Sequence, residues 1–180
     1  MKNNELINMV VENDLKSLGF NPNPKHEGMW TKGIPSTSSF FAITYVPSED
    51  CFFGPELNYE INGKSDCKSL FPTYSQEYGK LQDLNEVKVY YQKAIQLHNS
   101  YVAPKKRLIE LGSRTTIYHG DEAFECIYRA PTGGFTLMVA YDTIQGWYFS
   151  IDESGQHGYT IPSLNSPISE VIKLIEKVKK

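Results

Sequence analysis

Apolar residues recur at helical spacing in four parts of the chain. Val87, Tyr91 and Ala94, for example, fall on one stripe of an α-helix. Glycine follows the first and third of these parts, as Gly19 and Gly112, where helices commonly end. The pattern predicts helices over residues 4–18, 84–99 and 104–111, and a last helix that starts near Ser166 and Pro167 and runs to Val178.

Alternation of apolar and polar residues predicts strands in the first half of the chain, over residues 29–32, 39–46 and 51–61. Pro55 lies within the last of these strands, and a proline there indicates an edge position or a bulge. Leu57 and Tyr59 are expected on the core side of this strand. Glu56 and Glu60 then fall on its solvent side.

The last third of the chain carries the clearest sheet pattern. Short alternating runs begin at Phe124, Phe135 and Trp147, and turn residues separate them. Such runs predict a meander of antiparallel strands. Cys126 falls on the core side of the first run, which favours an inert buried thiol.

These elements predict an α+β fold, in which antiparallel sheets carry helices packed on one face. The chain of 180 residues fits a single domain, residues 1–180. The order helix, strands, helix occurs twice, and the offset that aligns Leu15 with Leu108 also aligns Gly19 with Gly112. Either residues 1–99 and 100–180 are pseudo-repeats, whose half-sheets pair into one sheet, or the same elements form an α+β layer structure without duplication.

Composition narrows the class of protein. The formal net charge of -3 argues against general nucleic-acid binding, which needs a basic surface. The N-terminal segment lacks the apolar core of a signal peptide, and no apolar run is long enough to span a membrane. Cys51, Cys67 and Cys126 have neither the spacing of a zinc site nor that of a disulfide framework. We therefore expect a cytoplasmic protein.

Recognised catalytic motifs are absent from the sequence: it has no phosphate-binding glycine loop, no G-x-S-x-G and no H-E-x-x-H. Two polar clusters at predicted strand boundaries contain histidines and carboxylates. Brought together, they would suit a metal site or an acid–base pair. The alternative, which we favour, is that they mark turns, and no cofactor or metal is then expected. The residues concerned are His119, Asp121, Glu122, Asp152 and His157.

Aromatic and acidic residues suggest a surface for protein contact. The polar connection over residues 62–82 and the loop over 153–165 carry tyrosines, which either bind a partner at little entropic cost or seal the sheet edges. Residues 47–62 contain acidic but no basic side chains, which would attract a basic partner. The predicted binding residues are Glu49, Asp50, Glu56, Glu60, Phe71, Tyr74, Tyr78 and Tyr159.

An amphipathic helix leads into Leu15–Phe20 at the start of the chain, and Met29–Lys32 and a strand follow. This opening, residues 1–45, resembles that of small bacterial immunity-type proteins. The resemblance implies a protein that neutralises a cognate toxin by occluding its active site. The layout also resembles α+β secretion chaperones, which likewise act by binding another protein.

The sequence therefore predicts a non-enzymatic protein-binding module, and the resemblance implies an immunity or inhibitor protein from a bacterial or phage conflict system. Its partner would be another protein, such as a basic toxin domain. Two alternatives remain open. One is a small metal-dependent hydrolase built on the histidine and carboxylate clusters. The other is a small-molecule sensor with Trp147, Tyr148 and Tyr159 lining a pocket.

Overall fold

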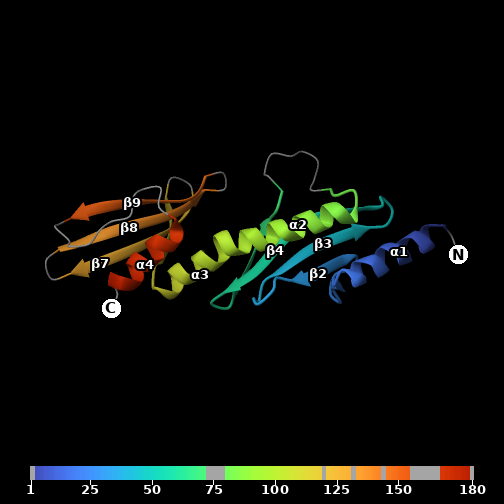
Figure 1. The fold of residues 1–180 in the computed structure, drawn as a ribbon, viewed down its shortest axis with the longest axis horizontal. Helices are drawn as coiled ribbons and strands as arrows, with labels where there is room; N and C mark the ends of the chain where they lie inside the picture. The colour runs from blue at the N-terminus through green and yellow to red at the C-terminus, as the bar shows by residue number, and fades with distance from the viewer. Residues whose placement is uncertain are drawn as a thin grey trace. The chain divides into compact units, whose positions relative to one another are not determined.

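The computed structural model describes residues 3–71, 80–118, 121–130, 133–142, 145–154 and 167–178 (Figure 1). The chain divides into two compact units, Met1–Ser100 and Tyr101–Lys180, and each is described by itself. Each unit has one antiparallel sheet and helices beside it, so the α+β fold class is confirmed. The described strands form two separate sheets. The duplication, one of the two alternatives left open by the sequence, is not confirmed.

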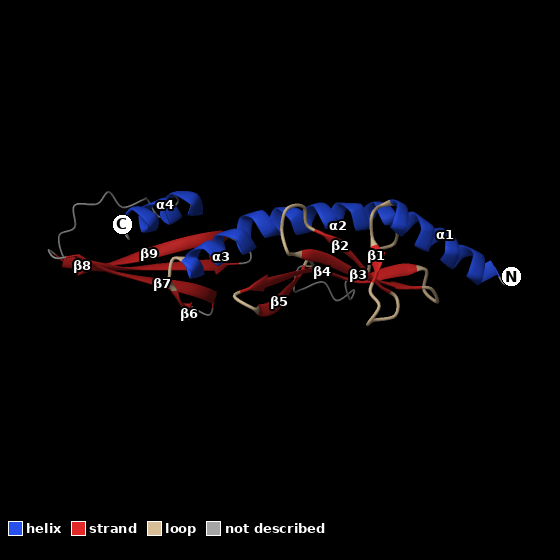
Figure 2. Ribbon diagram, turned by 90° about the horizontal axis from the view of Figure 1, so that it is seen from below, coloured by secondary structure: helices blue, strands red, loops and turns tan. Residues whose placement is uncertain are grey.

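The first unit contains a five-stranded sheet in the order β1-β2-β3-β4-β5, in which every neighbouring pair is antiparallel. Figure 2 shows both helices of this unit along one face of that sheet. This agrees with the packing predicted from the sequence. The elements are α1 (Asn3–Ser17), β1 (Asn21–Pro22), β2 (Met29–Gly33), β3 (Phe40–Val46), β4 (Cys51–Ile61), β5 (Lys64–Ser69) and α2 (Leu84–Leu97).

Aromatic side chains join the helices of the first unit to its sheet. The rings of Phe20, Phe41 and Tyr91 meet edge-on, with centroids 6.0–6.2 Å apart. The hydroxyl of Tyr91 donates to the carbonyl oxygen of Gly33 at 2.8 Å, so the polar tip of this buried ring is satisfied. Lys32 donates to the carbonyl oxygen of Leu18, the residue directly after α1, at 2.7 Å, and its Nζ lies 4.3 Å from the Tyr91 centroid. The cation thus satisfies the end of α1 and contacts the aromatic cluster.

Pro55 lies in a bulge of β4, as one of the two sequence-based alternatives predicted. Ala42 pairs with Glu56 and Thr44 pairs with Phe53, so one intervening residue of β3 faces two of β4. The edge position is excluded, because β4 lies between β3 and β5. The bulge accommodates a residue that has no N–H to donate to the ladder.

The prediction of an irregular connection over residues 62–82 was wrong in part. Strand β5 follows β4 directly, through a turn at Asn62 and Gly63 with φ angles of 52° and 75°. Asn-Gly is the sequence that favours a two-residue hairpin turn of this kind. The local turn signal therefore outweighs the polar composition of the strand that follows.

The second unit contains a four-stranded antiparallel sheet in the order β6-β7-β8-β9, which confirms the predicted meander over its last three strands. Strand β6 had no counterpart among the expected elements. Between α2 and α3 the chain forms a π-helical turn, η1 (His98–Val102), where the sequence predicted the end of a helix. The other elements are α3 (Ala103–Glu110), β6 (Arg114–Tyr118), β7 (Asp121–Ala130), β8 (Gly133–Asp142), β9 (Gly146–Ser154) and α4 (Ile168–Val178).

The core of the second unit lies between its helices and one face of its sheet. Phe124 and Cys126 of β7 belong to it, as do Val171 and Ile175 of α4. Cys126 is 5% exposed, which confirms the expectation of a buried thiol. The other buried members are Leu108, Leu137, Val139 and Phe149.

Asp83 caps the N-terminus of α2, and its removal gives a first testable prediction. Its carboxylate accepts the backbone N–H groups of Asn85 at 2.7 Å and Glu86 at 2.9 Å. Asp83→Ala leaves these donors without that partner and is expected to lower the free energy of unfolding by about 1 kcal/mol in urea denaturation. Asp83→Asn keeps the acceptor oxygen and should retain most of the stability. Equal losses in the two variants would contradict the cap.

Candidate binding pocket

A pocket of about 530 Å³ opens in the first unit, between α1 and the adjoining ends of β2 and β3. Helix α1 contributes Glu12 and Lys16 to its lining, and the loop between β1 and β2 contributes Asn23, His26 and Glu27. A volume of this size lies within the range of about 300–1,000 Å³ in which proteins bind small ligands. The rest of the lining comes from Pro22 of β1, from Gly28, from Met29 and Trp30 of β2, and from residues 44–47 at the end of β3.

Backbone contacts fix the loop that forms one wall of the pocket. The N–H of Asn23 donates to the carbonyl oxygen of Met29 at 2.8 Å, which closes the loop at its base. Gly28 has a φ of +76°, and its carbonyl oxygen accepts the N–H of Tyr45 at 2.8 Å. This left-handed conformation favours glycine, because a side chain there is strained. The wall is therefore tied to β3.

The floor of the pocket is aromatic and its rim is charged. Trp30 and Tyr45 are each only 4% exposed, whereas Glu12, Lys16 and Glu27 are exposed. The Nζ of Lys16 lies 6.0 Å from the centroid of the Trp30 ring. This distance is at the outer limit of a cation–π contact. The pocket therefore offers an apolar floor that can accept a cation.

Carboxylates dominate the electrostatics at the Tyr45 end. The Tyr45 hydroxyl donates to Asp50 at 3.0 Å. Burial, followed by the hydrogen bond and the charge of Asp50, raises the pKa of Tyr45 to about 12, and the charge of Glu12 adds to the shift. Glu12 and Glu27 form no ion pair with any residue in the described part of the chain. Negative charge around the pocket is thus left for a ligand to neutralise.

The raised pKa of Tyr45 predicts a loss of stability at alkaline pH. The unfolded tyrosine has a pKa of 10.0, so the folded state resists ionisation until about pH 12. The stabilisation is complete below pH 10 and is lost as the pH rises towards 12, by an amount of about 1–3 kcal/mol. Denaturant unfolding at several pH values should show a steeper loss in the wild type than in Tyr45→Phe. Parallel curves for the two proteins would contradict the assignment.

The pocket adjoins two of the binding residues predicted from the sequence. Asp50 binds Tyr45 in the pocket floor, and the neighbouring Glu49 forms an ion pair with Lys80 at 3.5 Å. Glu56 and Glu60 lie further along β4. The residues directly before and after each of them in the strand are buried, so both glutamates are on the face of the sheet away from the core. These four acidic residues therefore do not form one cluster.

The aromatic residues predicted for binding are only partly described. The ring of Phe71 lies 4.8 Å from that of Tyr90, a residue of α2, so it packs back against the unit. Tyr74, Tyr78 and Tyr159 lie outside the described residues. The contact of Phe71 favours the interpretation that it seals the sheet edge. For the three tyrosines, both interpretations stay open.

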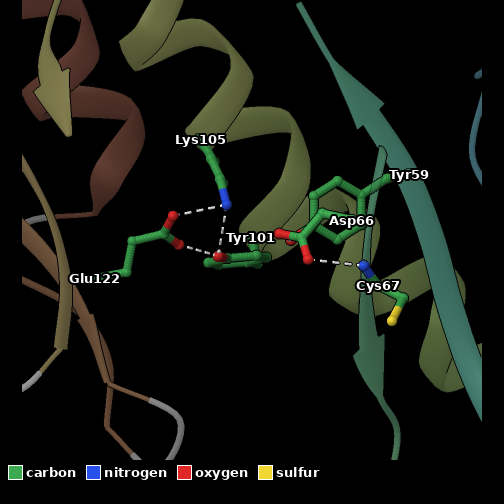
Figure 3. A network of polar contacts seen from close by, with 6 residues as sticks. All are labelled: Tyr59, Asp66, Cys67, Tyr101, Lys105 and Glu122. Carbon is green, nitrogen blue, oxygen red and sulfur yellow. Dashed lines mark hydrogen bonds and ion pairs between the residues drawn. The ribbon is translucent and has the colours of Figure 1, made fainter. Parts of the chain in front are cut away.

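Two members of the histidine and carboxylate clusters, Asp121 and Glu122, have partners of their own. Asp121 accepts the hydroxyl of Tyr148 at 2.9 Å. Glu122 pairs with the ammonium of Lys105 at 2.7 Å and accepts the hydroxyl of Tyr101 (Figure 3). The carboxylate compensates the charge of the buried lysine, and the network ties Tyr101 and α3 to β7 within the second unit.

No group of three or more potential ligand residues that could hold a metal occurs within the described part of the chain. His119 and His157 lie outside that part, and Asp152 lies in β9. Of the three aromatic residues expected to line a sensor pocket, Tyr159 lies outside the described residues. The other two, Trp147 and Tyr148, are adjacent in β9 and therefore point to opposite faces. Trp147 packs against the core of the second unit, whereas Tyr148 binds Asp121.

The sequence pattern does not reveal the residues that line the pocket. No residue near His26 in the sequence indicates a catalytic or metal-binding partner for it. Trp30 and Tyr45 fit the alternation of ordinary strands. A weak signal is present, because Gly28 follows two polar residues and precedes a strand, which favours a tight turn. Nothing in the sequence pattern brings Glu12 of α1 to the end of β3.

No protein-family model, curated protein or solved structure matches this chain. Among the described residues, no helix combines the length and apolar character that a membrane crossing requires. The function is therefore argued from the chemistry of the pocket itself.

Proposed function

We propose that the chain is a non-enzymatic binding module that recognises a basic partner protein at the pocket side of its first unit. The observation that carries this proposal is the combination of an aromatic floor, Trp30 and Tyr45, with two carboxylates, Glu12 and Glu27, that form no ion pair in the described part of the chain. Apolar floors supply binding energy and charged rims supply specificity at protein interfaces.

The specific form of the proposal is an immunity or inhibitor protein that covers a basic toxin domain. The resemblance to immunity-type proteins concerns residues 1–45, and this segment supplies all the lining residues of the pocket except Val46 and Pro47. Toxins that act on nucleic acids carry basic surfaces to bind phosphate. An acidic pocket on the inhibitor would complement such a surface.

Two acidic positions extend the negative potential beyond the pocket. Asp50 accepts a hydrogen bond from Tyr45, and Glu49 forms an ion pair with Lys80. Exposed charges act mainly on the rate of association and are screened by salt. We therefore expect the complex to form faster and bind more tightly at low ionic strength.

The experiment is affinity capture from the native cells with the tagged wild type and with Glu12→Lys/Glu27→Lys. Both substitutions are at exposed positions, so the fold should be retained, which circular dichroism verifies. The protein captured by the wild type and lost in the variant is then purified, and its affinity is measured by calorimetry at low and high salt. We expect at least tenfold weaker binding by the variant and weaker binding at high salt.

The proposal fails if no purified protein binds the wild type in this assay. It also fails if the captured protein binds both forms with equal affinity at every salt concentration, because the pocket side would then play no part. Turnover of the captured protein or of a metabolite by the purified chain would contradict its non-enzymatic character.

A further inference from the structure

We infer that the pocket is an anchor site for a single lysine or arginine side chain of the partner. The inference rests on the proposed function and names the group that enters the pocket. In this anchor site, the aliphatic stem of the partner's side chain lies on Trp30 and Met29. Its charged end lies near Glu12 and Tyr45.

The floor suits the stem of a basic side chain. Trp30 and Tyr45 are buried against the unit, and Met29 is half-buried beside them. Lysine and arginine commonly cover apolar surface with their methylene groups while the charged head remains at a polar rim. Aromatic rings and the sulfur of methionine are soft surfaces that adapt to such a stem.

The chain itself provides a cation in this place. Lys16 extends from α1 so that its Nζ lies 6.0 Å from the Trp30 centroid. It forms no ion pair with any residue that the structure describes, including Glu12 one turn earlier on the same helix. Lys16 is exposed, so a partner's side chain can displace it from the ring. Lys16 then acts as an internal competitor for the site.

The rim favours a cation over an anion. The lining contains the carboxylates of Glu12 and Glu27 and one ammonium, that of Lys16. Asp50 adds negative charge behind Tyr45, to which it is hydrogen-bonded. Glu12 lines the same pocket as Tyr45, and its charge adds to the raised pKa of Tyr45. An acidic peptide would meet these groups with repulsion.

The test uses the full chain and two short blocked peptides, acetyl-Gly-Arg-Gly-amide and the same peptide with citrulline in place of arginine. Citrulline keeps the length and planar end group of arginine, but it has no charge and carries a carbonyl oxygen in place of one amino group. Binding is followed by the NMR shift of the indole N–H of Trp30, assigned by its loss in Trp30→Phe. We expect the arginine peptide to shift this signal and the citrulline peptide to bind about three- to tenfold more weakly.

Charge variants test whether the pocket favours a positively charged ligand. Glu12→Gln/Glu27→Gln should weaken binding of the arginine peptide about three- to tenfold, because two exposed charges are removed. Lys16→Gln should strengthen it about two- to fivefold, because the competing cation is gone. Asp14→Asn/Glu170→Gln removes the same number of charges from exposed positions outside the pocket and should leave binding unchanged.

Three results with the peptides would overturn the inference: equal binding of the arginine and citrulline peptides, weaker binding by Lys16→Gln, or an equal effect of the control variant. A partner that binds Glu12→Gln/Glu27→Gln as well as the wild type would overturn the anchor site and leave protein binding intact. Selective binding of the arginine peptide by a chain that captures no protein would retain the cation site and overturn the proposed function.

Discussion

Replacing Phe124 with alanine is expected to lower the free energy of unfolding of the second unit by about 3–5 kcal/mol. Phe124 lies in β7 and is fully buried, with 0% of its surface exposed. It packs in the same cluster as Val139 and Ile175, and its ring centroid lies 6.0 Å from that of Trp147. Alanine removes the ring and leaves a cavity that the sheet and α4 cannot fill without moving.

Urea denaturation followed by circular dichroism measures this loss. The matched control is Ile117→Ala in the neighbouring strand β6, where the side chain is 69% exposed. This change should alter the free energy of unfolding by no more than about 0.5 kcal/mol. Similar effects of the two substitutions would contradict the position of the core.

Replacing Gly28 with alanine is expected to destabilise the first unit by about 1–3 kcal/mol and to weaken binding at the pocket. The φ of +76° is costly for alanine, and its Cβ would lie 2.9 Å from the backbone oxygen of Tyr45. Because that oxygen belongs to a strand, the contact can be relieved only by moving the pocket wall away from β3. The hydrogen bond from Tyr45 to Gly28 would then lengthen.

Gly33→Ala, at the other end of β2 in the same sheet, is the matched control. A Cβ added at Gly33 would meet no other atom within 4 Å, and the φ of this residue is not positive. The two variants are compared by thermal unfolding and by the NMR titration with the arginine peptide. A Gly28→Ala protein that matches Gly33→Ala in both measurements would contradict the role given to this turn.

Local sequence patterns were sufficient for most of the fold. The stripe that includes Val87, Tyr91 and Ala94 is buried in α2, as its spacing predicts. Pro55 indicated the bulge, because a residue without an N–H cannot continue a regular ladder. In both cases the deciding information lies within a few residues of the position concerned.

The missed strands show where local patterns fail. Strand β5 is polar and exposed along almost its whole length, so it carries no apolar alternation, and only the Asn62-Gly63 turn indicates it. Strand β6 is short, and its Ile117 is exposed instead of buried. Both strands lie at the edge of a sheet. Backbone hydrogen bonds to a single neighbouring strand hold them in place, and burial of side chains contributes little.

The candidate site was hidden for a different reason. The sequence indicates negative charge at Glu49 and Asp50, and Asp50 contacts Tyr45 in the floor of the pocket. The remaining carboxylates come from α1 and from the loop before β2, so their approach depends on how α1 packs on the sheet. Tertiary packing of this kind leaves no regular spacing in a sequence.

The most direct test of the binding account is an NMR map of the isotope-labelled full chain with the purified partner protein. The account predicts that the backbone and indole signals of Glu12, Glu27, Trp30 and Tyr45 shift or broaden on complex formation, and that excess arginine peptide reverses these changes. Changes confined to Glu56 and Glu60 on the other face of the sheet, or to residues of the second unit, would contradict it.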